Sequence, residues 1–187
     1  MHRQRKVLVA YDSRHGSTAE MAQTMAGALC SDNVVAVAKW VGHITDIDEY
    51  NAIIIGSAIR YDKWLPEATD FVVRHQPALQ QMPVSLFFTC MALSGKSEKA
   101  TAQAAEYAAK IAALLSRVSA TDVGQFAGAL DFGKIPFPTR LIARLIFVFL
   151  HVKQGDYRDW AAIRHWTETR TINTKTNHQP IRKGSSQ

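Results

Sequence analysis

The chain of 187 residues lacks the features that mark several common protein classes. Its two cysteines, Cys30 and Cys90, are too few for a disulfide-stapled scaffold or a four-cysteine zinc site. The longest strongly apolar run, residues 141–150, has about half the ~20 residues of a membrane-spanning helix and contains Arg144. The apolar stretch at residues 7–10 is too short for a secretory signal. These absences predict one domain in a reducing, cytoplasmic location.

Acidic residues are scarce in the last third of the chain. Residues 1–133 carry 12 Lys and Arg against 13 Asp and Glu, whereas residues 134–187 carry 10 against 3, so the basic excess lies entirely in the second part. The same part holds an apolar repeat at helical spacing, formed by Leu141, Ile142, Leu145, Ile146, Phe149 and Leu150. An apolar stripe among basic residues favours anionic lipid over nucleic acid, which usually requires stacking aromatic residues or a known motif.

Short apolar runs alternate with longer helical patterns along the chain. The runs predict strands at residues 7–11, 34–40, 52–57, 84–90 and 123–130. The patterns that separate and follow them predict helices at residues 17–30, 65–75, 98–116 and 157–170. This alternation is typical of a parallel sheet covered on both faces, so we expect an α/β, doubly wound, five-stranded fold of flavodoxin type in residues 1–170. The polar residues 171–187 predict a flexible tail.

The loop after the first predicted strand combines three hydroxyl side chains with a glycine. Its residues are Ser13, Arg14, His15, Gly16, Ser17 and Thr18. Ligands of a doubly wound sheet bind beyond the carboxyl ends of the strands, and the free N–H groups and positive dipole end of a helix start suit a phosphate. An ordinary helix N-cap needs only one such hydroxyl, so we favour a phosphate loop over a simple cap.

Motifs for other cofactors and for metals are missing from the sequence. No G-x-G-x-x-G occurs. Residues 95–97, Gly-Lys-Ser, resemble the end of a P-loop, but the position five residues earlier, where a P-loop has its first glycine, is Cys90. The seven histidines show no metal-binding spacing, so we expect no metal site. We interpret Cys90 as a small buried residue rather than a redox centre.

Three segments together resemble a known family. The Ser-x-His-Gly-Ser-Thr loop resembles the FMN-phosphate loop of flavodoxins, with His15 where Thr is usual. Residues 56–61, Gly-Ser-Ala-Ile-Arg-Tyr, and residues 127–130, Ala-Gly-Ala-Leu, followed by an apolar and basic insertion, resemble the quinone-dependent protoporphyrinogen IX dehydrogenases. These are flavodoxin-like enzymes of bacterial haem synthesis, and the likeness covers about residues 6–170.

The resemblance implies FMN as the cofactor and a set of residues around it. The loop at residues 13–18 would hold the FMN phosphate, and two further loops would flank the isoalloxazine ring. The ring-flanking residues would be Ser57, Ala58, Ile59, Arg60, Tyr61, Thr89, Cys90, Met91, Ala92 and Leu93. Tyr61 or Trp64 could stack on the ring, although Trp64 suits packing over the sheet edge equally well.

The resemblance also implies a reaction and its partners. The reaction would be the oxidation of protoporphyrinogen IX to protoporphyrin IX in haem biosynthesis, with menaquinone or ubiquinone as the acceptor, at the inner face of the cell membrane. The substrate carries carboxylates, so its candidate partners are Arg60, Lys63, Arg140 and Arg144. No side chain stands out as a catalytic acid or base.

The amphipathic helix that we expect at residues 137–153 has two interpretations. It could be an additional core helix or a contact in a homo-oligomer, or it could lie on the membrane surface and bring FMN to the quinone. The family resemblance and the basic charge of residues 134–187 favour the membrane surface.

Two other functions compete with the dehydrogenase. An electron-carrier flavodoxin is typically acidic, whereas this chain is basic, and positive charge from Arg14, His15 or Arg60 predicts a raised flavin potential that suits a quinone acceptor. A general FMN-dependent quinone reductase with a nicotinamide donor needs no dinucleotide fingerprint and therefore stays open.

Overall fold

The computed structural model describes residues 4–95, 98–118, 120, 122–130 and 155–173. Five parallel strands form its central sheet in the order β2-β1-β3-β5-β6. Their bounds are Arg5–Asp12 for β1, Val34–Trp40 for β2, Ala52–Arg60 for β3, Val84–Cys90 for β5 and Val123–Ala127 for β6. The predicted five-stranded, doubly wound fold is therefore confirmed.

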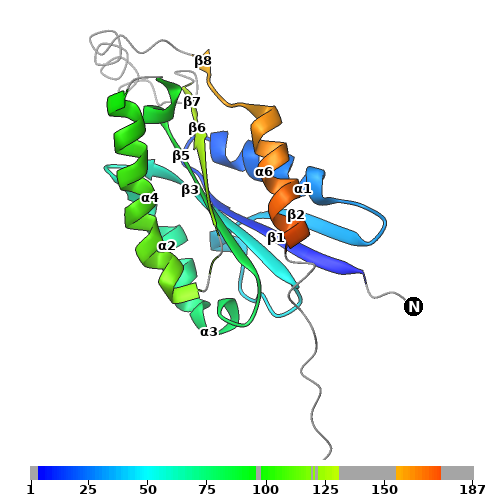
Figure 1. Cartoon of the computed structure of the whole chain (residues 1–187). Coiled ribbons are helices and arrows are strands. Elements are labelled where there is room, and N and C mark those ends of the chain that lie inside the picture. The colour runs from blue at the N-terminus through cyan, green and yellow to red at the C-terminus, as the bar shows by residue number, and fades with distance from the viewer. Residues whose placement is uncertain (1–3, 96–97, 119, 121, 131–154, 174–187) are drawn as a thin grey trace, which may run out of the picture.

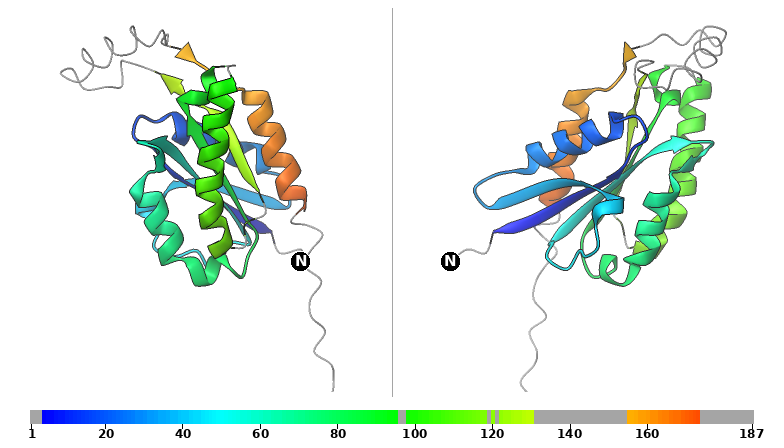
Figure 2. Two further views of the ribbon diagram at one scale, coloured as in Figure 1. Left: turned by 60° about the vertical axis from the view of Figure 1, so that its left-hand side comes forward. Right: turned by 180° about the vertical axis from the view of Figure 1, so that it is seen from behind.

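Helices cover both faces of the sheet (Figures 1 and 2). One face carries α1, Ser17–Leu29, and α6, Trp160–Asn173, which pack against each other. The other face carries α2, Pro66–Arg74, α3, Gln76–Leu79, and α4, Glu98–Val118. None of the helices within the described residues is long and apolar enough to cross a membrane.

The strands divide their apolar side chains between two cores because successive residues point to opposite faces. On β1, Leu8 and Ala10 join the core beneath α2 and α4, whereas Val7 and Val9 join the core beneath α1 and α6. Every residue of β5 is buried, as expected for a strand that has helices on both sides. This packing fixes the carboxyl ends of β1, β3 and β5 next to one another at one edge of the sheet.

Three strands differ from their predicted bounds, and the first of them is longer at both ends, Arg5–Asp12 instead of residues 7–11. The third strand continues to Arg60 and turns back into β4, Lys63–Trp64, because a two-residue turn allows antiparallel pairing. The strand predicted at residues 123–130 is interrupted at Gly128, whose N–H donates to the Cys90 carbonyl. The following pair, β7 at Ala129–Leu130, leaves the main sheet and pairs with β8, Gly155–Asp156.

The last helix is displaced from its predicted bounds. It begins at Trp160 rather than at residue 157, because the Asp159 carboxylate accepts a hydrogen bond from the Ala162 N–H and starts the helix there. It continues to Asn173, into the segment predicted as a tail from residue 171. The remaining tail and the amphipathic helix predicted at residues 137–153 lie outside the described residues.

Candidate functional site

The three loops singled out by the sequence lie at the carboxyl ends of the parallel strands. They follow β1, β3 and β5, and the strand register places Asp12 beside Ser57 and Ala58 beside Thr89. The loop after β5 contains the short 3-10 helix η2, Met91–Ser94. The structure therefore brings the predicted phosphate loop and both predicted ring loops to one place.

The phosphate loop leaves the start of α1 open. Gly16 occupies the N-cap position with φ at 87°, a left-handed conformation that glycine adopts readily, and no side chain caps the helix. The Ser13 hydroxyl instead accepts the Gly16 N–H at 3.0 Å, within the loop. The first N–H groups of an α-helix have no partner inside the helix. This start therefore offers N–H groups and a positive dipole end to an anion, and the simple hydroxyl cap is absent.

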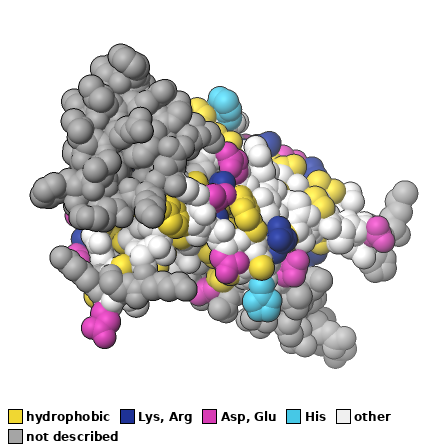
Figure 3. Space-filling view, turned by 90° about the horizontal axis from the view of Figure 1, so that it is seen from above, with side chains coloured by type: hydrophobic (Ala, Val, Ile, Leu, Met, Phe, Trp, Pro, Cys, Tyr) yellow, Lys and Arg dark blue, Asp and Glu magenta, His cyan; other side chains and the backbone are white. Residues whose placement is uncertain are grey.

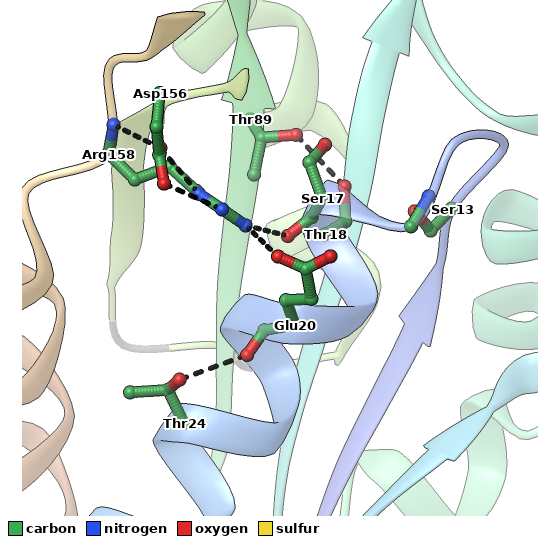
Figure 4. Close-up of polar contacts among 9 residues, drawn as sticks. Ser13, Ser17, Thr18, Glu20, Thr24, Thr89, Asp156 and Arg158 are labelled. Atoms are coloured by element: carbon green, nitrogen blue, oxygen red, sulfur yellow. Dashed lines mark hydrogen bonds and ion pairs between the residues drawn. The ribbon is translucent and has the colours of Figure 1, made fainter. Parts of the chain in front are cut away.

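A buried hydroxyl pair joins the phosphate loop to the loop after β5. Thr18 Oγ1 and Thr89 Oγ1 are 3.0 Å apart, and the two residues are 0% and 3% exposed. Figure 4 shows this contact crossing from the first turn of α1 to the end of β5. Both residues belong to the predicted set, and the contact fixes the spacing between the two loops.

Arg158 connects the first turn of α1 to the residues after β8 (Figure 4). Its guanidinium donates two hydrogen bonds of 2.7 Å to the Asp156 carboxylate and one of 2.7 Å to Glu20. It also donates to the Ser17 carbonyl at 3.3 Å, and its Cζ atom lies 4.3 Å from the centre of the Trp160 ring. The side chain is only 8% exposed, so these contacts hold a buried cation beside the phosphate loop.

A buried carboxyl lies directly before the phosphate loop. Asp12 is 3% exposed, and its Oδ1 accepts the Trp40 Nε1–H at 3.2 Å. Among the described residues, its Oδ2 has no hydrogen-bond donor, and neither has Oε2 of the neighbouring Glu67. Burial raises the pKa of Asp12, and the Glu67 carboxylate raises it further. The Arg14 guanidinium lies 3.6 Å from Glu67, so the positive charge expected from Arg14 is balanced there.

The ring loop after β3 has an inner and an outer part. Ser57 is buried, and its hydroxyl accepts the Leu65 N–H and donates to the Ala58 carbonyl, which fixes the return of the chain through β4. Ala58 and Ile59 are half-buried, whereas Arg60 and Tyr61 are exposed. Trp64 is 6% exposed and packs in the core, so it covers the sheet edge instead of presenting its ring to a ligand.

The ring loop after β5 is more closely packed. Cys90 is buried, and burial raises the pKa of its thiol, which agrees with its interpretation as a small buried residue. Met91, Ala92 and Leu93 are half-buried in η2. The Ser94 hydroxyl donates to the Met91 carbonyl at 2.6 Å and closes this short turn. Apolar atoms and main-chain groups therefore line this side of the site.

These features fit a flavin mononucleotide better than a metal. The open helix start with its hydroxyls suits a phosphate, and half-buried loops of small and apolar residues suit a flat ring. The described residues contain no group of three His, Cys, Asp or Glu placed to hold a metal ion. Where it is described, the surface seen from above mixes apolar, acidic and basic side chains (Figure 3).

The sequence did not point to several residues of this site. Asp12 ends an apolar strand and carries no motif, and Arg158 lies far from the phosphate loop in sequence. Tyr107 is one of many residues of a long helix, yet its hydroxyl donates to Asp62 in the turn after β3 at 2.6 Å. The one signal for Asp12 in the sequence is that it is an acidic residue at the end of an otherwise apolar strand, where burial of a charge is costly.

Comparisons with known proteins agree with this geometry. Protoporphyrinogen IX dehydrogenase [quinone] of Escherichia coli (strain K12) is 27% identical over 168 residues, which cover 86% of this chain and 92% of the relative. A protein of the same name from Leishmania major is 29% identical over 169 residues, covering 86% of this chain and 72% of the relative. The family resemblance inferred from the sequence is therefore confirmed.

Solved structures show the same fold at low identity. Oxidised flavodoxin 2 from Bacillus cereus superposes with a TM-score of 0.54 at 16% identity, covering 90% of this chain and 99% of that one. A flavo-diiron protein mutant from Thermotoga maritima superposes with a TM-score of 0.57 at 14% identity, covering 92% of this chain and 37% of that one. The family model of the flavodoxin domain matches residues 8–156. With its strand order, its open helix start and this match, the chain belongs to the flavodoxin domain family.

Proposed function

We propose that this protein is an FMN-dependent enzyme that oxidises protoporphyrinogen IX to protoporphyrin IX with a membrane quinone as acceptor. The observation that carries the proposal is the match, over 86% of the chain, to relatives that bear this activity in their names. The flavodoxin domain implies FMN as the cofactor. The reaction removes six hydrogens in three two-electron steps, and each step reduces one quinone to a quinol, so electrons and protons balance.

The chain's own residues would bind and orient the cofactor. The N–H groups at the start of α1, with the hydroxyls of Ser13 and Ser17, would hold the phosphate, and the buried Thr18 would fix the loop against Thr89. Both arginines beside this loop are paired with carboxylates, so an anion there would rely on N–H groups, hydroxyls and the helix dipole. The loops after β3 and β5 would flank the ring and keep water from its edge. Bound there, FMN would supply the two-electron redox chemistry.

The turn after β3 would meet the substrate. Arg60 and Lys63 are both exposed on either side of this turn, where a carboxylate of the substrate can reach them. The other two candidate partners, Arg140 and Arg144, lie outside the described residues. The protoporphyrin product is a flat ring with carboxylates, which suits an exposed aromatic residue beside cations, and Tyr61 lies between Arg60 and Lys63 in the sequence.

Access to the quinone would depend on residues 137–153. These residues lie outside the described part, and in their sequence apolar residues recur at helical spacing among arginines and a lysine. Basic charge attracts the anionic surface of a membrane, and an apolar stripe can enter it. We therefore infer peripheral attachment to the membrane through this segment.

The test is anaerobic oxidation of protoporphyrinogen IX by the FMN-loaded full chain, followed by porphyrin fluorescence, with and without a menaquinone analogue. We expect porphyrin to form only when the quinone is present, with about one quinol formed per two electrons removed. The control is the same protein stripped of FMN. Tight FMN binding without porphyrin above the protein-free rate would contradict the proposal and favour an electron carrier or another reductase.

A further inference from the structure

The turn between β3 and β4 has a strained backbone. Arg60 pairs with Lys63 across the hairpin, and the two residues between them, Tyr61 and Asp62, have φ angles of 49° and 60°. Two-residue hairpins with both φ angles positive are usually formed by Asn-Gly or Gly-Gly, because a side chain crowds the backbone in this conformation. A tyrosine and an aspartate in this turn therefore require support from elsewhere in the fold.

Burial of the turn does not provide that support. Tyr61 is 84% exposed, and its ring contacts the Arg60 guanidinium, which lies 5.1 Å from the ring centre. Arg60 and Tyr61 therefore form a cation–π pair on the surface. Strained backbone at an exposed tip is a feature of functional loops, whose conformation is set by what they contact and not by their own packing.

Support comes from helix α4 on the same face of the sheet. Tyr107 of this helix is 6% exposed and donates its hydroxyl hydrogen to Asp62 Oδ1 at 2.6 Å. Gln103, one turn earlier, donates to the Tyr107 oxygen at 2.8 Å. Burial and Asp62 raise the pKa of Tyr107 to about 12, so the phenol keeps its proton. This donor is therefore present across the physiological pH range.

The same tyrosine also reaches the other ring loop. Its ring packs edge-on against Phe88 of β5, two residues before the end of that strand at Cys90, with ring centres 6.3 Å apart. Helix α4 also contacts η2, the short helix after Cys90. Tyr107 therefore contacts Phe88, near the end of the strand that leads into one ring loop, and Asp62, at the tip of the other ring loop.

We propose that Tyr107 is a positioning residue for the ring site, which holds the turn at Tyr61 and Asp62 at a fixed distance from the loop after β5. The proposal rests on the proposed function, since it assumes that these loops flank FMN. The chain would use this one hydroxyl to set the position of Tyr61, so that its ring meets the face of the flavin or of the substrate. A residue that only fills the core would lack this directional contact.

The test compares Tyr107→Phe with Tyr50→Phe. Tyr50 is buried to the same degree, at 7% exposed, and lies before β3 at the opposite edge of the sheet. Tyr107→Phe retains the ring against Phe88 and removes only the hydroxyl. We expect the dissociation constant for FMN to rise about tenfold in Tyr107→Phe and to stay unchanged in Tyr50→Phe, because FMN binding would then have to order a turn that the Tyr107 hydroxyl otherwise holds in place.

A second measurement does not depend on activity or on the cofactor. In the FMN-free protein, amide hydrogen exchange at residues 61–63 should accelerate in Tyr107→Phe, while exchange in β1 and α1 stays as in the wild type. Asp62→Asn, which keeps an acceptor oxygen and tolerates the left-handed conformation, should behave as the wild type in both measurements. Asp62→Ala, which lacks the acceptor, should behave as Tyr107→Phe.

The outcomes separate this inference from the proposed function. If the wild type binds FMN and Tyr107→Phe binds it equally well, the positioning role is wrong while the proposed function survives. If exchange at residues 61–63 does not change, the tie between Tyr107 and the turn is wrong. If the wild type fails to bind FMN, both proposals fail together.

Discussion

The two ends of the candidate site are built in different ways. The phosphate end consists of residues 13–18 with Thr89 and Arg158, and its Thr18 and Thr89 hydroxyls and the Arg158 guanidinium are buried and tie the loop to other elements. The ring end is formed by the two ring loops, and the tip of the loop after β3, at Tyr61 and Asp62, is a strained, exposed turn held by the Tyr107 hydroxyl. The FMN phosphate takes no part in the proposed reaction, so a rigid site of main-chain groups suits it. The flavin ring would have to be reached by both the porphyrinogen and the quinone, so it needs an accessible surface. Under the proposed function, binding strength and reaction specificity would be assigned to separate parts of the site.

The largest effect on the difference between the two ends is expected from a substitution at Gly16 in the phosphate end. Gly16→Ala places a side chain on a residue with φ at 87°, which costs about 1–2 kcal/mol and shifts the first turn of α1. We expect the FMN dissociation constant to rise at least tenfold, as measured by quenching of flavin fluorescence. The matched control is Gly27→Ala in the same helix, where an added side chain meets no atom within 4 Å. It should leave FMN binding intact and stabilise the helix by about 0.5–1 kcal/mol.

The next largest effect is expected from the buried cation. Arg158→Met keeps much of the side-chain volume but removes the guanidinium hydrogen bonds to Asp156, Glu20 and the Ser17 carbonyl. Because both carboxylates are partly exposed, we expect a loss of about 2 kcal/mol in the free energy of unfolding, measured by urea titration. Arg164→Met, an exposed position on α6, should change stability by less than about 0.5 kcal/mol. Equal effects at the two positions would contradict the role assigned to Arg158.

The hydroxyl pair can be separated by a double-mutant cycle. Thr18→Val leaves the buried Thr89 hydroxyl without its partner and should cost about 1–2 kcal/mol of stability. The double variant Thr18→Val/Thr89→Val removes both hydroxyls at nearly constant shape and should cost less than the sum of the two single variants. Additive effects in urea titrations would show that the two hydroxyls do not interact. FMN affinity should fall in both variants that contain Thr18→Val, since the phosphate loop loses its contact with the end of β5.

The smallest effect concerns Asp12 and depends on pH. Its pKa is raised in the folded protein by burial, so the ionised carboxylate destabilises the fold, and this cost grows as the pH rises above the value of an unfolded aspartate, about 4. Asp12→Asn keeps an acceptor for Trp40 and carries no charge. We expect it to be more stable than the wild type at pH 7 by about 1 kcal/mol, with the difference vanishing near pH 4.

A thermal-unfolding series from pH 4 to pH 8 checks the Asp12 prediction. The control variant is Asp70→Asn on α2, where the carboxylate is exposed and its removal should have little effect at any pH. A difference between Asp12→Asn and the wild type that grows toward low pH would contradict the assigned direction of the pKa change.

The sequence predicted the strands of the sheet and the loop that follows the first strand because both depend on local patterns. Buried parallel strands are short apolar runs, and the phosphate loop is contiguous from Ser13 to Thr18. The resemblance added the two ring loops, which the register of β1, β3 and β5 places at one edge. Contiguous segments at the ends of strands are the part of a site that sequence reasoning finds most readily.

The residues that support these loops could not be predicted in this way. Arg158 contacts Ser17 across 141 positions of sequence, and Tyr107 contacts Asp62 across 45. Such contacts depend on how helices lie on the sheet, which hydrophobic periodicity does not specify. The break at Gly128 was also missed, because β7 leaves the sheet to pair with a strand that begins at Gly155. A two-residue ladder carries too little pattern to be recognised.

The pairing of β7 with β8 has a consequence for how this family can diversify. Ala129 lies beside Asp156 and Leu130 beside Gly155, so the chain leaves the flavodoxin core and returns to it at adjacent positions. The entropic cost of joining two such fixed points rises only slowly with the length of chain between them. Relatives can therefore lengthen, shorten or exchange the intervening residues during evolution while the core and its phosphate cradle keep their geometry. A redox domain with such an attachment point can acquire new partners without being rebuilt.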